Sequence, residues 1–351
     1  MEEENIELPQ ENQESPQEEH QPSSETENKG YSLPDPQLQK IAQSVDKVRN
    51  ELRKVIVGQD DMIDLLLTAL FSGGHVLIEG VPGIAKTLTA KLLAKTLSVD
   101  FSRIQFTPDL MPTDIIGTSV FNVKTSEFTF KSGPVFSNIV LIDEINRSPA
   151  KTQAALFEVM EERQVTVDGH QYQMDFPFFV IATQNPIEQE GTYKLPEAQL
   201  DRFLFRIKIK YPSFNEEKDI LRKFREDFRM EIINEVHGIL RVEDIQACQK
   251  IVEKVFIKED LLDYIATIVC NTRDNGEIFL GASPRASLAI MKSSKALAAI
   301  NGRNFVTPDD IQFVAYPVLN HRIILSSERE LEGSESEDVI KEIIQKIEVP
   351  R

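Results

Sequence analysis

Apolar positions along this chain follow two different patterns. Between residues 37 and 55 they recur every three or four positions, which predicts an amphipathic helix. Elsewhere the apolar residues form short, uninterrupted runs, which are typical of strands buried on both faces of a parallel sheet. The sequence therefore predicts an α/β fold with a parallel sheet, whose strands are expected over residues 75–79, 139–142, 178–183 and 203–209.

The first run leads into a loop that suits phosphate binding, Gly80-Val81-Pro82-Gly83-Ile84-Ala85-Lys86-Thr87, followed by a helical pattern over residues 88–97. Strand, glycine-bearing loop, Lys-Thr and helix form the architecture of a Walker A loop, in which backbone N–H groups and the positive helix end hold phosphates. Lys86 would neutralise the β- and γ-phosphates, and the Thr87 hydroxyl would hold Mg²⁺. Ala85 departs from the G-x-x-x-x-G-K-[ST] pattern, so an ordinary Gly/Pro turn is the alternative.

Two further runs also end in groups that suit a nucleoside triphosphate. The run over residues 139–142 ends in Asp143-Glu144, where Asp143 would bind Mg²⁺ through water and Glu144 would polarise the attacking water. The run over 178–183 ends at Gln184-Asn185, and Asn185 could hydrogen-bond that water or the γ-phosphate. Parallel strands present their carboxyl ends at one edge of a sheet, so these groups are expected to converge. A solvated Asp-Glu pair is the alternative.

Hairpins and capped helices are expected between and after these strands. One hairpin is predicted over residues 118–131, and a second over 165–172, where Asp168-Gly169 forms a two-residue turn. Ser148-Pro149 is expected to begin a helix that runs to about Glu162, with proline in its first position.

Helical periods dominate beyond Pro212. Ser283-Pro284-Arg285 is expected to begin one helix, and Thr307-Pro308 another, with Asp310 completing a capping box. A last helix is expected near residues 339–347. We therefore expect three parts: a disordered acidic tail (1–32), an α/β core (33–212) and a mostly helical domain (213–351).

The net charge of −18 is spread unevenly along the chain. Residues 1–30 contain ten Glu and one Lys, a net charge of −9, with almost no apolar residues, so this segment is expected to be disordered. It lacks the features of a signal peptide, and no apolar window is long enough to insert into a membrane. Cys248 and Cys270 have no metal-ligand spacing. These features predict a cytoplasmic protein, and the acidic balance argues against sequence-independent nucleic-acid binding.

The order of these segments resembles that of the MoxR family of AAA+ ATPases. The resemblance covers about residues 38–348, and alanine at position 85 is common in the phosphate loop of that family. It implies a P-loop NTPase core of three αβα layers with β-hairpin inserts, followed by a helical lid. The segments that carry it are Val57-Gly58-Gln59, GVPGIAKT (80–87), IVLIDEINRSPAKTQAALFEVMEERQVTVDG (139–169), IATQNPIEQEGTYKLPEAQLDRF (181–203), GASPRA (281–286) and His321-Arg322.

The resemblance also implies residue roles. Walker A would comprise Gly80 to Thr87, followed by Leu88, and Walker B would end in Asp143 and Glu144. The remaining roles would be Val57 to Gln59 flanking the adenine of ATP, Asn185 as sensor 1, Arg202 as the arginine finger, Arg285 as sensor 2, and both hairpins facing a central pore.

Each arginine could also have a purely structural role. A cation in the first turn of a helix opposes the helix dipole, so Arg285 is either aimed at an anion or part of a surface salt bridge. Arg202 could instead pair with Asp201 or a nearby Glu, and Arg147 is a rival finger candidate. His321-Arg322 could be a simple helix-end pair.

The function favoured by the resemblance is that of an ATPase forming a hexameric ring, which uses ATP and Mg²⁺ to remodel a protein client in a chaperone-like manner. In this family the usual partners carry a von Willebrand factor A domain. One alternative is a nucleic-acid motor, as in the minichromosome maintenance helicases, whose hairpin tips are expected to be basic and aromatic. The tip at Lys124-Thr125-Ser126 carries one Lys and the tip at Asp168-Gly169 carries an acid, which disfavours this alternative. A metal-insertion subunit like that of magnesium chelatase is another. Retention of the catalytic residues argues against a non-hydrolysing scaffold.

Overall fold

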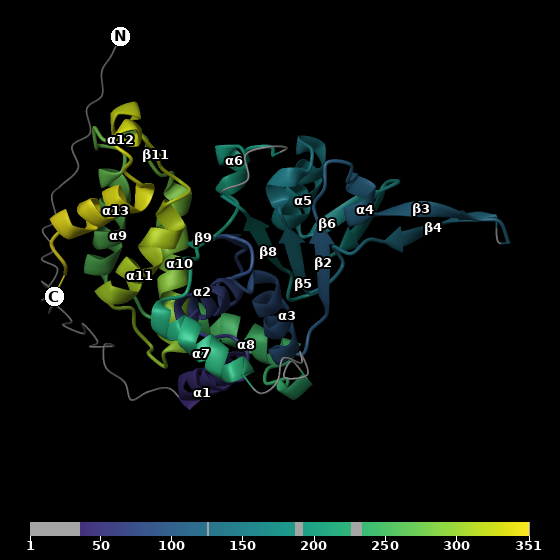
Figure 1. The fold of residues 1–351 in the computed structure, drawn as a ribbon, viewed down its shortest axis with the longest axis horizontal. Coiled ribbons are helices and arrows are strands. Elements are labelled where there is room, and N and C mark those ends of the chain that lie inside the picture. Colours follow the sequence, from purple (N-terminus) through teal and green to yellow (C-terminus); the bar gives the residue numbers. More distant parts are fainter. Residues whose placement is uncertain (1–35, 125, 187–191, 226–233, 351) are drawn as a thin grey trace, which may run out of the picture. The chain divides into compact units, whose positions relative to one another are not determined.

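A parallel sheet of five strands lies at the centre of the core (Figure 1). This computed structural model describes residues 36–124, 126–186, 192–225 and 234–350. The proposed tail at 1–32 lies outside them. The strand order is β2-β5-β8-β1-β9, and all neighbours are parallel. The predicted α/β fold and its four strands are thereby confirmed, as β1 Val76–Glu79, β5 Ile139–Asp143, β8 Phe179–Gln184 and β9 Phe205–Lys208. The fifth strand is β2 Phe101–Gln105.

The strand β2 was not predicted. It lies at one edge of the sheet, and of its five residues only Ile104 is buried. An edge strand with polar residues on its exposed positions carries little of the apolar signal by which buried strands are recognised. The edge position therefore explains why the sequence alone missed it.

Alternate residues of the central strands enter two separate hydrophobic clusters. Ile139 and Leu141 pack with helices α1 (Pro36–Arg53), α2 (Asp60–Phe71) and α3 (Lys86–Thr96) and with the helical domain. Val140 and Ile142 pack on the other face with α4 (Pro112–Ile116) and α5 (Ala150–Glu162). Burying an aliphatic side chain contributes about 1.5–3 kcal/mol, so the unbroken apolar runs stabilise both faces of the sheet. This is the three-layer arrangement expected from the sequence.

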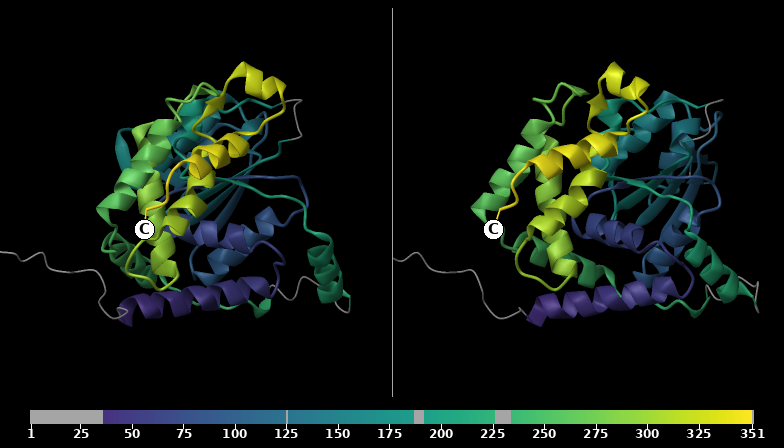
Figure 2. Two further views of the ribbon diagram at one scale, coloured as in Figure 1. Left: turned by 90° about the vertical axis from the view of Figure 1, so that its left-hand side faces the viewer. Right: turned by 60° about the vertical axis from the view of Figure 1, so that its left-hand side comes forward.

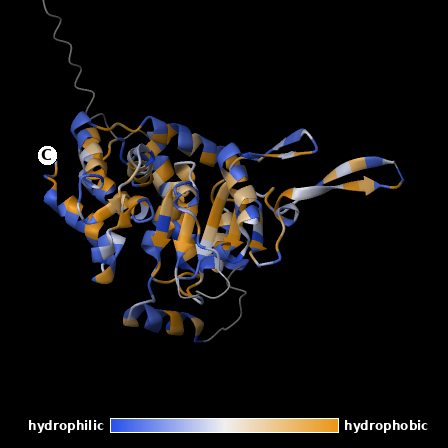
Figure 3. Ribbon diagram, turned by 90° about the horizontal axis from the view of Figure 1, so that it is seen from above, coloured by the Kyte–Doolittle hydropathy of each residue, from blue (hydrophilic) through white to orange (hydrophobic). Residues whose placement is uncertain are grey.

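The two predicted hairpins are present. They are formed by β3 (Gly117–Asn122) with β4 (Glu127–Ser132), and by β6 (Gln164–Val167) with β7 (His170–Gln173). Asp168 and Gly169 both have positive φ, 51° and 78°, as a two-residue hairpin turn requires. Both hairpins project from the body of the core (Figure 3). They contact each other through the rings of Phe130 and Tyr172, which stack with centroids 4.2 Å apart.

The segment before α5 differs slightly from expectation. Pro149 is the N-cap residue rather than the first helical residue, and the helix begins at Ala150. Pro149 has an extended ψ of 152°, so its backbone has not yet turned into the helix. Between β5 and α5 lies a single 3₁₀ turn, Ile145–Arg147, and the short helix α6 (Glu197–Leu200) precedes β9.

The part of the chain beyond β9 is mostly helical, as predicted. Ser283 and Thr307 are N-caps, and Asp310 completes the expected capping box. A two-stranded sheet of β10 (Ile278–Leu280) and β11 (Ile324–Leu325) was not predicted, because strands this short leave no periodic signal. The helices are α7 Phe214–Phe224, α8 Val242–Glu253, α9 Glu259–Asn271, α10 Pro284–Ile300, α11 Pro308–Leu319, α12 Ser327–Leu331 and α13 Ser336–Lys346.

Helix α1 packs against both parts of the molecule. Its buried face contacts α3 of the core and α10 of the helical domain, and it runs beneath both in Figure 2. The core and the helical domain thus share one hydrophobic cluster, and the division at residues 212/213 remains a prediction. Within the described ranges, every helix is too short or too polar to cross a membrane.

Candidate nucleotide site

The loop between β1 and α3 turns sharply at residues with left-handed backbone conformations. Gly83 has φ 89°, and Ala85, the N-cap residue of α3, has φ 61° and ψ 19°. A Cβ atom at Gly80 would lie 2.6 Å from Ile84 Cδ1 and 3.1 Å from the Ile209 carbonyl oxygen, so a side chain here would displace Ile84 and crowd that carbonyl. Ala85 tolerates a conformation that costs a non-glycine residue on the order of 1 kcal/mol. The loop holds the shape of a phosphate cradle despite the missing second glycine.

Lys86 and Thr87 are the first residues of helix α3, and their side chains contact the phosphate loop and Asp143, respectively. The Lys86 ammonium donates to the Gly80 carbonyl oxygen at 2.5 Å, so its side chain folds back over the loop. The Thr87 hydroxyl donates to Asp143 Oδ2 at 3.3 Å. The first N–H groups of a helix have no partner within the helix. A cation, backbone donors and a hydroxyl therefore meet at the start of α3, as anion binding requires.

Asp143 is buried at the carboxyl end of β5, with 7% of its surface exposed. Its Oδ1 accepts a hydrogen bond of 2.9 Å from the Thr183 hydroxyl on β8. Its Oδ2 accepts one of 2.7 Å from Arg103 Nε on β2. Three elements thus hold the carboxylate beside Thr87. Arg103 was missed from the sequence because β2 itself was missed.

Glu144 follows with a left-handed backbone, φ 59°, which turns its side chain away from the strand direction. Its backbone N–H donates to the Thr183 hydroxyl at 3.1 Å. Its Oε2 accepts a hydrogen bond from Gln105 Nε2 at 2.9 Å and lies 3.1 Å from Arg147. Gln105 was not identified from the sequence. Arg147, the rival finger candidate, lies beside a carboxylate of its own chain.

Asn185 is buried directly after β8, with 8% of its surface exposed. The preceding residue, Gln184, accepts a hydrogen bond of 3.2 Å from the backbone N–H of Gly80. The end of β8 is therefore joined to the phosphate loop on one side and, through Thr183, to Asp143 on the other. The structure brings the loop, both acids and the amide to one edge of the sheet.

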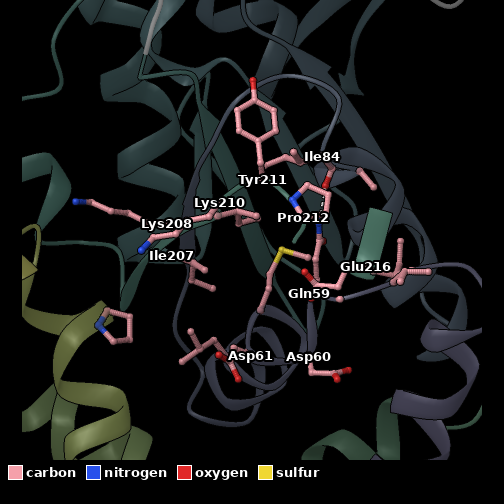
Figure 4. A pocket seen from close by; sticks show the side chains of 18 of the residues that line it. Gln59, Asp60, Asp61, Ile84, Ile207, Lys208, Lys210, Tyr211, Pro212 and Glu216 are labelled. Carbon is pink, nitrogen blue, oxygen red and sulfur yellow. Dashed lines mark hydrogen bonds between the residues drawn. The ribbon is translucent and has the colours of Figure 1, made fainter. Parts of the chain in front are cut away.

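A cavity of about 1160 Å³ opens beside the loop, large enough for a nucleotide (Figure 4). Gln59 Nε2 donates to the Ile84 carbonyl oxygen at 2.8 Å, whereas its Oε1 is buried without a partner among the described residues. Such an orphaned acceptor suits an exocyclic amino group. The lining includes Val57, Gly58, Gln59, Pro82, Gly83, Ile84, Ala85, Leu88, residues 206–212 in and after β9, and parts of α7, α11 and α13.

The donor set beside the loop fits Mg²⁺. The Thr87 hydroxyl and the Asp143 carboxylate supply the oxygen ligands that this ion prefers, together with phosphate oxygens and water. Groups of three or more His, Cys, Asp or Glu side chains that could hold a metal by themselves do not occur in the described part of the chain. The residues therefore suit an ion that arrives with a phosphate.

Arg202 and Arg285 lie together around Glu161, at the end of α5. The described lining of the cavity includes neither arginine, and it also does not include Lys86, Thr87, Asp143, Glu144 or Asn185. Arg202 Nε lies 2.8 Å from Glu161 Oε2, and Arg285 lies 3.5 Å from Glu161 Oε1 and 3.6 Å from Asp201 Oδ2. Both arginines are thus engaged in ion pairs within the chain, as the purely structural interpretation anticipated.

His321 and Arg322 hold the turn that carries Arg202. His321 Nε2 lies 3.0 Å from the Phe203 carbonyl oxygen. Arg322 donates to Asp201 Oδ1 at 2.7 Å and to the Phe203 carbonyl oxygen at 2.7 Å. Burial lowers the pKa of the Arg322 guanidinium, and the hydrogen bond to Asp201 opposes that shift. This pair is therefore more than a helix-end feature, which the sequence alone did not reveal.

Comparison with known proteins agrees with this geometry. Residues 75–205 match a family model described as the ATPase family associated with various cellular activities, and residues 270–343 match an AAA lid domain. Chaperone MoxR1 of Mycobacterium tuberculosis is 44% identical over 86% of this chain and 81% of its own length. The chain belongs to the MoxR family of AAA+ ATPases.

Two further similarities extend over almost the whole described part of this MoxR-family chain. Protein YeaC of Bacillus subtilis is 48% identical over 87% of this chain and 94% of its own length. The crystal structure of a candidate ATPase from Cytophaga hutchinsonii, 44% identical, matches 90% of this chain and 97% of its own with a TM-score of 0.82. The expected P-loop core with a lid domain is thereby confirmed.

Proposed function

We propose that this chain hydrolyses ATP with the help of Mg²⁺, within a ring of identical subunits, to remodel a protein client. The observation that carries this proposal is the convergence at the sheet edge. The Thr87 hydroxyl and Asp143 Oδ2 are 3.3 Å apart, and Thr183 joins Asp143 to the backbone of Glu144. The oxygens proposed to hold Mg²⁺ and the residue proposed to polarise water are therefore joined through the Thr183 hydroxyl.

The residues divide the work in the following way. Lys86 and the loop N–H groups hold the β- and γ-phosphates, and the oxygens of Thr87 and Asp143 hold Mg²⁺, which neutralises charge on the phosphates. Glu144 orients and polarises the attacking water, and Asn185 hydrogen-bonds the same water or the γ-phosphate. Glu144 can do so only after its carboxylate leaves Gln105 or Arg147, both of which it contacts in the isolated chain.

Arg202 and Arg285 act on the nucleotide of a neighbouring subunit. Both side chains are partly exposed, at 33% and 60%, and both form ion pairs with Glu161 on α5. A trans-acting arginine typically raises the rate of phosphoryl transfer by about 10³–10⁵. Hydrolysis should therefore require assembly, and a hexameric ring is the form favoured by family resemblance.

A protein client is favoured over nucleic acid by the side chains of the first hairpin. Phe121 and Phe128 pair across its strands with ring centroids 5.2 Å apart. Their exposed fractions are 49% and 74%. Nucleic-acid binding depends chiefly on basic surface, and residues 117–132 carry two Lys beside one Glu, so we assign the exposed aromatic pair to an apolar polypeptide. A client with a von Willebrand factor A domain is the partner favoured by family resemblance.

The proposal is tested by ATP binding and turnover of three full-length variants. Lys86→Ala should lose ATP binding, Glu144→Gln should bind ATP without hydrolysing it, and Arg202→Ala should bind ATP but turn over at least 10³-fold more slowly. Turnover per subunit should rise with protein concentration as the ring assembles. Full activity of a monomer, or normal turnover of Glu144→Gln, would refute the proposal. DNA-stimulated turnover would instead favour the nucleic-acid motor.

A further inference from the structure

Glu161 is shared by the two arginines just assigned to the neighbouring subunit's nucleotide. It lies at the end of α5, with 41% of its side chain exposed. One carboxylate oxygen lies 2.8 Å from Arg202 Nε, and the other lies 3.5 Å from Arg285. One carboxylate therefore contacts both arginines, one with each oxygen.

The two arginines come from different parts of the molecule. Arg202 lies in the turn between α6 and β9 of the core, whereas Arg285 lies in the first turn of α10 in the helical domain. In Figure 1, α6 lies between α5 and the helical domain. Asp201 adds a second link, since it contacts Arg285 at 3.6 Å and Arg322 at 2.7 Å. Glu161 is thus the point at which a core arginine and a lid arginine meet.

These contacts contribute little to folding. Side-chain exposures of 33% for Arg202 and 60% for Arg285 place them in the solvent-screened class of ion pairs, each worth at most about 1 kcal/mol. The first turn of a helix is moreover an unfavourable place for a cation. A weak but specific arrangement of this kind is easily exchanged for a polyphosphate, which offers more negative charge than one carboxylate.

The Arg202 side chain also contacts an aromatic ring of α5. Its guanidinium carbon lies 5.8 Å from the centroid of the Phe157 ring, one helical turn before Glu161 on α5. An aromatic face and a carboxylate on the same helix thus restrict the guanidinium on two sides. Helix α5 presents the arginine, rather than merely packing beside it.

We propose that Glu161 is a positioning residue, which holds Arg202 and Arg285 as a pair so that core and lid deliver both cations to one anion on the adjacent subunit. This inference rests on the proposed function, in which both arginines act across the subunit boundary. Removing the charge of Glu161 leaves ATP binding by the same chain intact, because its ion pairs are with the two arginines assigned to the neighbouring nucleotide. It lowers turnover at the neighbouring site instead.

The first test compares Glu161→Gln with Glu162→Gln, which changes the adjacent exposed acid on the same helix. Glu161→Gln should reduce kcat about tenfold or more, with KM and ring mass unchanged, because misplacement of a catalytic group by about 1 Å can cost 10²-fold. Glu162→Gln should match the parent protein. Equal kcat for both variants would overturn the proposal.

The second test separates positioning of the arginines from a general structural role. Full-length Glu144→Gln subunits lack the carboxylate that polarises the attacking water but retain both arginines, whereas Arg202→Ala subunits retain that carboxylate. Mixing these inactive variants should restore turnover. Adding Glu161→Gln to the Glu144→Gln chain should then reduce that recovery about tenfold. Adding it to the Arg202→Ala chain should leave the recovery unchanged.

The outcomes distinguish the inference from the proposed function. If the two parent variants fail to restore turnover when mixed, the arginines do not act across subunits, and the proposed function and this inference both fail. If the parents complement each other but Glu161→Gln has the same effect in either chain, only the inference is overturned. An effect confined to the chain that supplies the arginines supports it.

Discussion

Arg322 Nε lies 2.7 Å from Asp201 Oδ1, so that the end of α11 in the helical domain is joined to the residue next to Arg202. Only 4% of the Arg322 side chain is exposed. The same guanidinium also donates to the carbonyl oxygens of Phe203 and Val318, at 2.7 and 2.6 Å. This contact ties the turn that carries Arg202, the arginine finger candidate, to the helical domain.

Removing this buried guanidinium should be costly. Arg322→Ala leaves Asp201 and several carbonyl groups without their donor, and breaking a buried ion pair in this way costs about 3–5 kcal/mol. The free energy of unfolding in urea measures the effect. The matched control is Arg222→Ala, which breaks an exposed pair with Asp219, with exposures of 62% and 55%, and should cost less than about 1 kcal/mol. Similar losses for both variants would contradict the prediction.

Replacement of Ala85 should show that its backbone conformation is strained. Ala85→Gly should stabilise the chain by up to about 1 kcal/mol, since glycine adopts φ 61° without a Cβ penalty. Ala85→Val should destabilise it and weaken ATP binding, because a β-branched residue is poorly tolerated at positive φ.

Ala154→Gly, at an exposed position within α5, provides a control of opposite sign. It should cost about 1 kcal/mol, since glycine is a poor residue in a helix. Thermal and urea unfolding of the three variants would measure the differences. A loss of stability in Ala85→Gly comparable to that in Ala154→Gly would show that Ala85 carries no strain.

Stability should fall on acidification because His75 is buried in its neutral form. Its Nδ1 accepts a hydrogen bond of 3.0 Å from the Val180 N–H, so Nε2 carries the proton and faces the Met160 carbonyl oxygen at 3.2 Å. Burial lowers the pKa of His75 from 6.5 to about 4. Burial also lowers the pKa of His321 well below 6.5.

Between pH 6.5 and 4 the unfolded chain therefore binds more protons than the folded chain. The free energy of unfolding should decrease as the pH falls through this window, by about 1.4 kcal/mol per pH unit for each buried histidine. Urea unfolding at several pH values from 7 to 5 measures the slope. His75→Gln should reduce it, whereas His170→Gln, at an exposed position of the second hairpin, should not. A slope unaffected by His75→Gln would contradict the assignment.

The two cysteines should differ in reactivity towards a thiol reagent. Cys248 is buried, and burial raises the pKa of its thiol to about 12, so almost no thiolate forms at pH 8. Cys270 is exposed. One thiol per chain should react quickly in the folded protein, and the second only after unfolding. Cys270→Ser should abolish the rapid phase, and its persistence in that variant would show that Cys248 is accessible.

Much of the site could be placed from sequence because its parts lie at the ends of unmistakable strands. Residues 139–142 are fully buried, so their apolar run had one physical interpretation, and the acids that follow had to emerge at the edge of the sheet. Arg103 and Gln105 escaped notice for the opposite reason. They belong to an edge strand whose exposed polar residues resemble those of a loop.

The arrangement of the arginines required tertiary structure. Glu161, Arg202 and Arg285 are separated by 41 and 83 positions in sequence, and no short-range pattern connects them. Their contact arises because the helical domain packs against the core through a shared hydrophobic cluster, with Arg322 joined to the turn before β9. Charge alone predicted that each arginine would meet an anion, but not which one.

By itself, the sequence determined four of the five strands of the central sheet, the phosphate loop, most of the expected helix caps and the family, because apolar periodicity and turn chemistry act over a few neighbouring residues. Only the tertiary structure decided which distant side chains share a partner, how β2 completes the site with Arg103 and Gln105, and where the lid meets the finger candidate. Such contacts depend on how whole helices and strands pack against one another, and the free energy of that packing cannot be predicted from any short segment of sequence.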